Sequence, residues 1–256
     1  ARTEYLFKTP EDAEAFLSLP YEPPELDANP YHRVRRKIAD DGLVLAACGG
    51  NPVCLAASSF SPDNFCLLWA QNPDLLIRLT ETAAERMRDC VHRLCHQGVR
   101  ALRMVGGEYV TVQLGPSAVG PLLKRFDPEI IDIVHRHGGL VFYHNHGPLM
   151  RFLDDLAELG ADVLDPLEAP PWGDADLTSA RSVLADRTAI LGNLDDMEVL
   201  GKRPEADVRA MAEANLQAFG TRGYLLGGTT SGTYTEHAAE NFLALVEVAR
   251  TYGWQP

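Results

Sequence analysis

The 256-residue sequence lacks any long apolar run, and no stretch approaches the roughly 18 consecutive apolar residues of a membrane-spanning helix. Its first residues, Ala1-Arg2-Thr3-Glu4, contain no apolar signal core and no starting methionine, which leaves room for an upstream segment. No two cysteines are spaced C-x-x-C, and all five lie in the first 95 residues. An odd number of thiols without a framework is typical of reduced, mostly buried cysteines, so we expect a cytoplasmic protein.

Positive charge is also scarce, because 36 acidic residues outnumber 23 basic ones and give a net charge of −13. A surface of that sign repels nucleic acid and anionic lipid. The one basic run long enough to reverse this locally is Arg33–Lys37, which we interpret as the solvated face of a helix. The composition therefore predicts neither a nucleic-acid partner nor a membrane partner.

What the sequence does contain is a regular alternation of short apolar runs and stretches with helical period. With 46% hydrophobic residues the chain can form a sizeable core. Continuous apolar runs are typical of strands buried on both faces, as in parallel sheets. The predicted strands cover residues 43–48, 101–105, 140–143, 161–164, 188–191 and 223–226. The predicted helices cover residues 73–97, 128–137, 148–159, 176–184, 205–219 and 236–252.

This alternation predicts an α/β protein of the TIM-type (β/α)8 barrel class, whose usual length is about 250 residues. A barrel needs eight strands, so we expect one that lacks its N-terminal strand or strands in this chain. The loop-rich residues 1–42 are predicted to pack on a barrel formed by residues 43–256, with a first helix starting at Thr9-Pro10. A doubly wound open sheet is the alternative, but no G-x-G-x-x-G opens a predicted helix.

Polar residues follow the predicted strands at the points where active sites of α/β barrels lie. They form five segments, which we expect to converge at one rim: Gly106–Glu108, His144–Gly147, Asp165–Glu168, Gly192–Asp196 and Gly227–Gly232. Polar groups at the ends of otherwise apolar strands predict an enzyme.

His144 and His146 are the sharpest pair in these segments. Two residues apart in extended chain, both side chains point the same way and can hold one zinc ion between them. Alternatively, His146 caps the following helix and His144 hydrogen-bonds a neighbouring loop. The remaining histidines are interpreted as surface or ordinary core residues: His32, His92, His96, His135, His137 and His237.

The acidic residues Glu108, Glu168, Asp195 and Asp196 could complete a metal shell or act as acid/base groups. Each could equally cap the helix that follows it. The Gly227–Gly232 loop could bind an anion through backbone N–H groups at a helix entrance, or could be a flexible turn.

Four stretches together resemble the uroporphyrinogen decarboxylase superfamily: LVFYHNHG (Leu140–Gly147), LAELGADVL (Leu156–Leu164), ILGNLD (Ile190–Asp195) and Glu240-Asn241. The resemblance is collinear from about Phe7 to Gly253 and implies an α/β barrel. It also implies a longer N-terminal region, including the first strand, that this chain does not contain.

Two chemistries occur in this superfamily. Its decarboxylases use N-terminal Arg and Asp residues, a Tyr whose place falls near Ser58, and a late His whose place falls near Ser231. Its methyltransferases, which move methyl groups between corrinoids and thiols, bind zinc through H-x-C-G and a later Cys. His144-Asn145-His146-Gly147 is similar to that stretch with His in place of Cys, and Ser231 or Thr230 falls at the later Cys. The resemblance is therefore greater to the methyltransferase branch.

The expected function is metal-assisted methyl transfer in corrinoid-linked one-carbon metabolism, with zinc, a corrinoid co-substrate, and a small-molecule or corrinoid-protein substrate. A missing barrel strand would leave an open edge through which a homodimer could form. Uroporphyrinogen decarboxylase is one alternative, and a non-catalytic corrinoid- or tetrapyrrole-binding protein is another. The expected site residues are His144, His146 and Glu168 for the metal, Glu108, Asp195 and Ser231 for catalysis, and Asn193, Gly228, Thr229 and Thr230 for the cofactor.

Overall fold

The computed structural model describes residues 4–184, 187–220, 222–229 and 234–252. They form two compact units, Ala1–Tyr143 with Leu159–Ala161, and His144–Glu158 with Asp162–Pro256. Across the described ranges, no helix combines the length and the apolar character needed to cross a bilayer.

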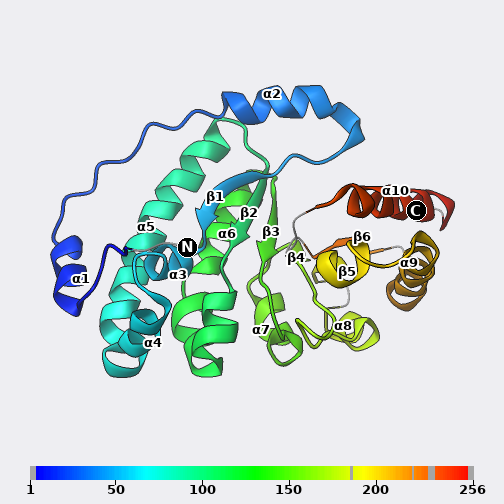
Figure 1. Cartoon of the computed structure of the whole chain (residues 1–256). Helices are drawn as coiled ribbons and strands as arrows, with labels where there is room; N and C mark the ends of the chain where they lie inside the picture. The colour runs from blue at the N-terminus through cyan, green and yellow to red at the C-terminus, as the bar shows by residue number, and fades with distance from the viewer. Residues whose placement is uncertain (1–3, 185–186, 221, 230–233, 253–256) are drawn as a thin grey trace. The chain divides into compact units, whose positions relative to one another are not determined.

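The first unit contains three strands in chain order and the helices that connect them (Figure 1). Strand β1 runs parallel to β2, with Ala46 opposite Leu102 and Gly50 opposite Val105. The strands are β1(Ala46–Gly50), β2(Ala101–Val105) and β3(Leu140–His144). The α-helices are α1(Pro10–Leu17), α2(Asn29–Ile38), α3(Pro52–Ala57), α4(Pro62–Gln71), α5(Pro73–His96) and α6(Asp127–Arg136). Short 3-10 and π-helical turns are η1(Ala39–Asp41), η2(Tyr109–Leu114), η3(Pro116–Ala118) and η4(Val119–Lys124).

Helix α5 is the long central helix of this unit and packs against both α3 and α6 (Figure 1). Its start is fixed by Asn72, whose side chain accepts from the amide of Leu75, and by Pro73 in the first turn. Its end is fixed by Gly98, whose φ of +89° continues the chain in the left-handed region. An apolar stripe at helical spacing, including Leu76, is buried, which is what stabilises the helix.

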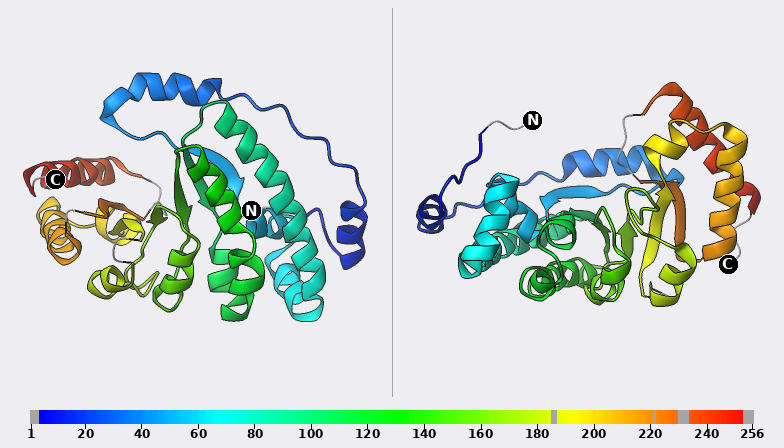
Figure 2. Two further views of the ribbon diagram at one scale, coloured as in Figure 1. Left: turned by 180° about the vertical axis from the view of Figure 1, so that it is seen from behind. Right: turned by 60° about the horizontal axis from the view of Figure 1, so that its bottom comes forward.

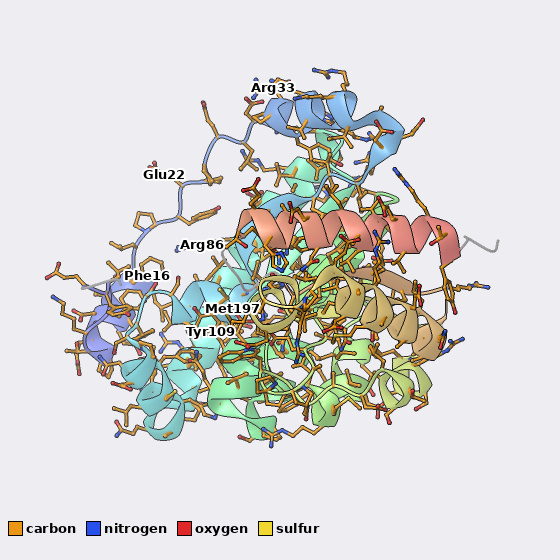
Figure 3. All side chains as sticks on the ribbon, turned by 45° about the vertical axis from the view of Figure 1, so that its right-hand side comes forward. Phe16, Glu22, Arg33, Arg86, Tyr109 and Met197 are labelled. Atoms are coloured by element: carbon orange, nitrogen blue, oxygen red, sulfur yellow. The ribbon has the colours of Figure 1, made fainter. Side chains whose placement is uncertain are left out.

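The N-terminal segment is attached to α5 through Arg86. The guanidinium carbon of Arg86 lies 4.8 Å from the ring centroid of Phe16, and both residues are labelled in Figure 3. The same carbon lies 4.7 Å from the ring centroid of Tyr21. Both contacts are cation–π interactions. Helix α2 has no buried residue and exposes the basic run that includes Arg33, so the predicted solvated helix face is confirmed.

The second unit repeats the strand–helix alternation. Strand β5 is parallel to β4 on one side and to β6 on the other. Helices α9 and α10 pack against each other and lie side by side in both views of Figure 2. The strands are β4(Val163–Asp165), β5(Ala189–Leu194) and β6(Tyr224–Gly228). The helices are α7(Leu153–Glu158), α8(Leu177–Leu184), α9(Glu205–Phe219) and α10(Glu236–Tyr252), with shorter turns at η5(Met150–Phe152) and the π-helical η6(Asp196–Leu200).

The predicted parallel α/β class is confirmed, and six strands lie in the described residues, as the apolar runs indicate. The first strand lies later than predicted, at 46–50 instead of 43–48, because two glycines belong to it. A side chain at Gly50 would come within 3.2 Å of the Val105 carbonyl oxygen and would collide with Cys54, so only glycine fits there. The division between units falls after Tyr143, and the predicted division into 1–42 and 43–256 stays a prediction.

Candidate functional site

His144 and His146 lie together in the second unit, where β3 ends. Their ring centroids are 4.4 Å apart, and the two ring planes are nearly perpendicular at 89°. His144 is buried, whereas the side chain of His146 is about one-third exposed at 30%. The two-residue spacing thus brings the imidazoles together as the sequence predicts.

Each of these histidines contacts a carboxylate at or just after the end of β4. Nδ1 of His144 is 3.1 Å from Oδ2 of Asp165, and Nδ1 of His146 is 3.1 Å from Oε1 of Glu168. An ionised carboxylate only accepts hydrogen bonds, so the proton of each neutral ring is on Nδ1 and its lone pair is on Nε2. Metal-binding histidines in proteins are held in this way by a carboxylate on their other nitrogen. Asp165 lies in one of the five predicted segments, but the sequence assigned it no role, because its role depends on this contact across the fold.

Glu168 is fixed by two donors. Its Oε1 faces His146, and its Oε2 accepts from the amide of Gly147 at 2.7 Å. Burial raises the pKa of Glu168, but the hydrogen bonds from His146 and Gly147 outweigh it and bring the pKa below its usual value of 4.5. The carboxylate is therefore anionic at neutral pH.

The three predicted metal ligands do not form a closed set. In the described part of the chain, His144, His146 and Glu168 do not bring three ligand atoms within 4.8 Å of one another. Both oxygens of Glu168 already have partners, His146 and the amide of Gly147. These contacts are typical of a carboxylate that orients a metal ligand. The role of Glu168 as a direct ligand stays a prediction.

Asp195 supports the turn that follows β5. Its Oδ1 accepts from the amides of Met197, at 2.9 Å, and Glu198, so it caps η6. Its Oδ2 is buried, and among the described residues it has no hydrogen-bond partner. One oxygen of Asp195 therefore caps η6, as the capping alternative predicts. The other oxygen takes no part in the cap, and the catalytic role of Asp195 stays a prediction.

Asp196 joins the ends of β5 and β6. Its amide donates to Oγ1 of Thr229 at 3.2 Å, and its Oδ1 accepts from the amide of Thr229 at 3.0 Å. Because the Thr229 amide is bound to a carboxylate, an anion at this loop would depend on residues 230–232. Thr230 and Ser231, predicted for the cofactor and for catalysis, lie outside the described residues. Gly228 approaches Asp196 so closely that a side chain at position 228 would overlap its carboxylate.

Asn193 has an unusual backbone for a strand residue, with φ of +98°. Few residues other than glycine adopt such values, and they are concentrated at functional sites. Its Nδ2 donates to the Leu167 carbonyl at 3.0 Å, and its Oδ1 accepts from Asn215 at 3.2 Å. The side chain thus ties β5 to the loop after β4, and its predicted cofactor contact stays a prediction.

Glu108 belongs to the first unit, after β2. It is half-buried, and its Oε2 is buried with no hydrogen-bond partner within the described ranges. Burial first, and then the charge of Glu108, raise the pKa of the Cys54 thiol to about 11. These properties are compatible with the predicted catalytic role, which stays a prediction.

A buried polar network in the first unit was not predicted. Oδ2 of Asp127 accepts from the Tyr143 hydroxyl at 2.7 Å and from Nδ2 of Asn51 at 2.9 Å. Burial raises the pKa of Asp127 to about 7 against the opposing effect of these two donors. Asp127 reads in the sequence as an ordinary first-turn acid before Pro128, so no local signal marks it.

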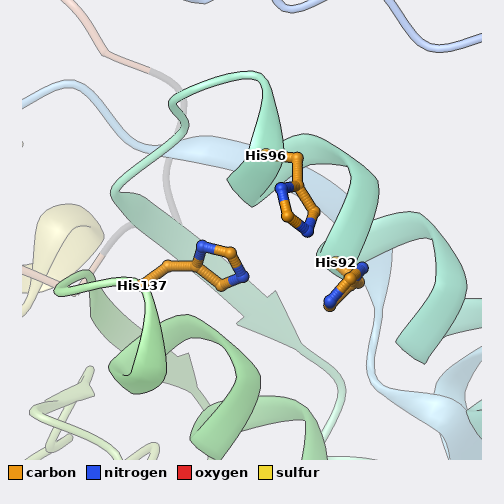
Figure 4. A group of neighbouring side chains, drawn as sticks. All are labelled: His92, His96 and His137. Carbon is orange, nitrogen blue, oxygen red and sulfur yellow. The ribbon is translucent and has the colours of Figure 1, made fainter.

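Three histidines that were interpreted singly also come together in the first unit. One nitrogen from each of His92, His96 and His137 lies within 4.8 Å of the other two (Figure 4). His92 and His96 are exposed and His137 is half-buried, which agrees with their interpretation as surface or ordinary core residues but did not indicate that they meet. The sequence signal was the H-x-x-x-H spacing in α5, but the third histidine is 41 positions later.

The sequence of the chain matches the model of the uroporphyrinogen decarboxylase (URO-D) family over residues 9–252. The chain belongs to this family. The expected family is thereby confirmed, and the six described parallel strands agree with the partial (β/α)8 barrel expected for it. A comparison with curated proteins gave no match.

Two solved structures have a similar fold. One is a methyltransferase from Methanosarcina mazei, with a TM-score of 0.72 and 20% identity over 86% of this chain. The other, from Listeria monocytogenes, is described as a vitamin-B12-independent methionine synthase, with a TM-score of 0.58 and 12% identity over 91% of this chain and 73% of that one. This chain spans 62% of the length of the Methanosarcina protein. At these identities the likeness shows the fold.

Proposed function

We propose that this URO-D family protein is an enzyme of corrinoid-linked one-carbon metabolism that transfers a methyl group to a thiol with the help of a metal held by His144 and His146. The observation that carries the proposal is that each imidazole is held on Nδ1 by its own carboxylate, Asp165 or Glu168. The methyltransferase name of a structure with the same fold supports the reaction class.

Methyl transfer to a thiol needs a sulfur nucleophile at neutral pH, where a free thiol is mostly protonated. A zinc ion held by His144 and His146 would supply it, because a thiol coordinated to zinc is deprotonated. The chain's own contribution is to orient the two rings. Asp165 and Glu168 hold Nδ1 of each ring, so Nε2 is the nitrogen with which each ring would bind the ion.

Within this proposal Glu168 orients His146, and the metal would bind the substrate thiol. Asp195, whose Oδ2 is buried without a partner in the described residues, is the proposed acceptor of the thiol proton. Two imidazoles make a harder and less anionic shell than one containing two thiolates. The different shell leaves room for a different thiol acceptor, which a panel of thiols in the assay identifies.

The acidic residues at the strand ends of the second unit argue against the alternative function, uroporphyrinogen decarboxylation. Uroporphyrinogen carries many carboxylates, which call for arginine forks in the pocket. The segments 144–147, 165–168 and 192–196 contain four acidic residues and no arginine. Acids at the strand ends repel such a substrate.

The test is to measure both reactions on the longest natural form of the protein and on His144→Ala and His146→Ala. Metal content is measured alongside methyl-corrinoid demethylation with a panel of thiols and uroporphyrinogen decarboxylation. His237→Ala is the matched control, because His237 is an exposed histidine of the same unit. Loss of one metal equivalent together with demethylation supports the proposal. Uroporphyrinogen turnover that survives both substitutions overturns it.

A further inference from the structure

A second cluster of imidazoles lies at the ends of α5 and α6, in the first unit. His92 and His96 are one helical turn apart on α5, and His137 is the C-cap residue of α6. Ring centroids are 4.4 Å apart for His92 and His96, 4.9 Å for His96 and His137, and 5.6 Å for His92 and His137. Figure 4 shows the three side chains pointing toward one another from the two helices.

The donor atoms are close enough for one ion. Zinc–nitrogen bonds of about 2.0–2.1 Å in a tetrahedral shell place ligand nitrogens about 3.3 Å apart. The three nitrogens already lie within 4.8 Å, so rotations of the rings, without movement of the helices, can close the shell. Imidazole is a ligand that suits zinc, copper and nickel.

The backbone also favours a cation here. His96 is the last residue of α5 and His137 follows the last residue of α6, so both stand at helix C-termini. The unpaired carbonyl groups of a helix C-terminus carry a partial negative charge that attracts cations. The ends of α5 and α6 therefore carry partial negative charge beside the three imidazoles, part of which Arg100 compensates at the Cys95 carbonyl.

Nearby guanidinium groups are engaged by other acceptors. Arg136 pairs with Asp132, and Arg100 donates to the carbonyls of Cys95 and Val99 at 2.7 and 2.8 Å. Arg93 pairs with Asp89 at 3.2 Å. These contacts keep the arginines beside the site from occupying it.

We propose that His92, His96 and His137 bind one divalent transition-metal ion, with zinc as its probe, and that the ion connects the C-terminal ends of α5 and α6. Three protein ligands leave the fourth position of a tetrahedral ion to water. The site belongs to the first unit and shares no residue with the metal site proposed at His144 and His146 in the second. Binding of the ion stabilises the folded chain, because an ion that binds only the native state raises the melting temperature.

The two sites are separated by doing the experiment in the double variant His144→Ala/His146→Ala of the whole chain. Metal-free protein is titrated with zinc sulfate by calorimetry, and its melting temperature is measured with and without zinc. We expect one zinc equivalent and a raised melting temperature in this background. Adding His92→Ala and His137→Ala should remove that equivalent and the thermal shift together.

His135→Ala is the matched control, since His135 is an exposed histidine two positions before His137 on α6. The His135→Ala variant should still bind the zinc equivalent, with less than about a tenfold change in affinity. Loss of two ligands should weaken zinc binding by more than about 10–100-fold, which is the effect of losing a residue that only orients a ligand. His96→Gln, with circular dichroism to verify folding, tests the third ligand separately. Equal zinc stoichiometry with and without the three histidines overturns the inference, while leaving the proposal at His144 and His146 untouched.

Discussion

Glu168 holds His146 by a contact of 3.1 Å between Oε1 and Nδ1, and it is itself held by the amide of Gly147. The carboxylate is buried, and its pKa lies below the usual value despite that burial, because both neighbours donate to it. A buried anion that fixes the ring orientation of a histidine makes Nε2 of that ring a better electron donor. In the proposed site His146 binds the metal and Glu168 orients His146, so the two residues have separate roles.

This separation predicts the behaviour of Glu168→Gln. The glutamine amide keeps the size of the side chain but removes the negative charge, and its NH₂ group cannot accept from Gly147 while its oxygen faces His146. We expect zinc to bind at His144 and His146 with unchanged stoichiometry and with an affinity lower by about 10–100-fold. Competition with a chromophoric chelator measures this affinity.

Glu213→Gln, on the exposed surface of α9, is the control and should leave the affinity unchanged. Loss of one whole zinc equivalent in Glu168→Gln, with the fold intact, would instead identify Glu168 as a direct ligand.

The neighbouring glycines 227 and 228 give a prediction with a built-in control. A Cβ at Gly228 would lie within 3 Å of Phe242 and would overlap Asp196, whose carboxylate binds the Thr229 amide. We expect Gly228→Ala to lower the free energy of unfolding by about 1–3 kcal/mol, as overpacking in a core does. At Gly227 the nearest atom is 3.8 Å away, so Gly227→Ala should change it by less than about 1 kcal/mol in either direction. Urea unfolding of both variants measures the difference. Equal effects would show that the close contacts of Gly228 do not make a side chain at that position more destabilising than one at Gly227.

Secondary structure was predictable where local signals fix both ends of an element. Helix α9 begins after Pro204 and ends before Gly220, whose φ is +92°, and its bounds are those that were predicted. Strand β2 is likewise found at 101–105, because a buried parallel strand is a continuous apolar run. The π-helical turns η2, η4 and η6 could not be predicted, since no periodicity in the sequence distinguishes them from loops or α-helix.

The site was predictable only in part, for a related reason. The i, i+2 spacing of His144 and His146 is local, so their proximity follows from a strand. Their carboxylate partners are about 21 positions later, and only the register of β4 shows which acid meets which ring. Asp127 and His137 had no local signal at all, because their partners Tyr143, His92 and His96 come from other elements.

Arg86 gives a prediction about how the N-terminal segment is held. Its guanidinium contacts the rings of both Phe16 and Tyr21, and each cation–π contact contributes about 0.5–1 kcal/mol at a partly exposed site. Arg86→Ala should therefore destabilise the protein by about 1–2 kcal/mol, and Arg86→Lys by less. Hydrogen exchange should show weaker protection in α1 for the alanine variant. Glu85→Ala, at an exposed neighbouring position of α5, is the control, and the same exchange pattern in both variants would mean that the ring contacts do not hold this segment.

Asp127 predicts a pH dependence of stability that runs opposite to that of most carboxylates. Burial raises its pKa to about 7 from the usual 3.8, although Tyr143 and Asn51 both donate to its Oδ2. Below about pH 4 the group is protonated in both the folded and the unfolded chain and contributes no pH dependence. Between about pH 4 and pH 7 the unfolded chain loses this proton while the folded chain keeps it, so stability falls as pH rises. The fall is about 1.4 kcal/mol for each unit of pKa difference, which gives at most about 4 kcal/mol over the interval.

Asp127→Asn removes this titration, because asparagine is a neutral residue with the shape of the protonated acid and its oxygen can accept from Tyr143 and Asn51. Its unfolding free energy relative to the natural protein should therefore rise between pH 4 and pH 8, by up to about 4 kcal/mol. Urea unfolding at a series of pH values measures the difference. Asp132→Asn is the control on the exposed face of α6, where loss of the surface ion pair with Arg136 should change stability by at most about 1 kcal/mol. A difference between Asp127→Asn and the natural protein that stays constant from pH 4 to pH 8 would show that Asp127 is already ionised in the folded state, with Asn51 and Tyr143 stabilising its charge.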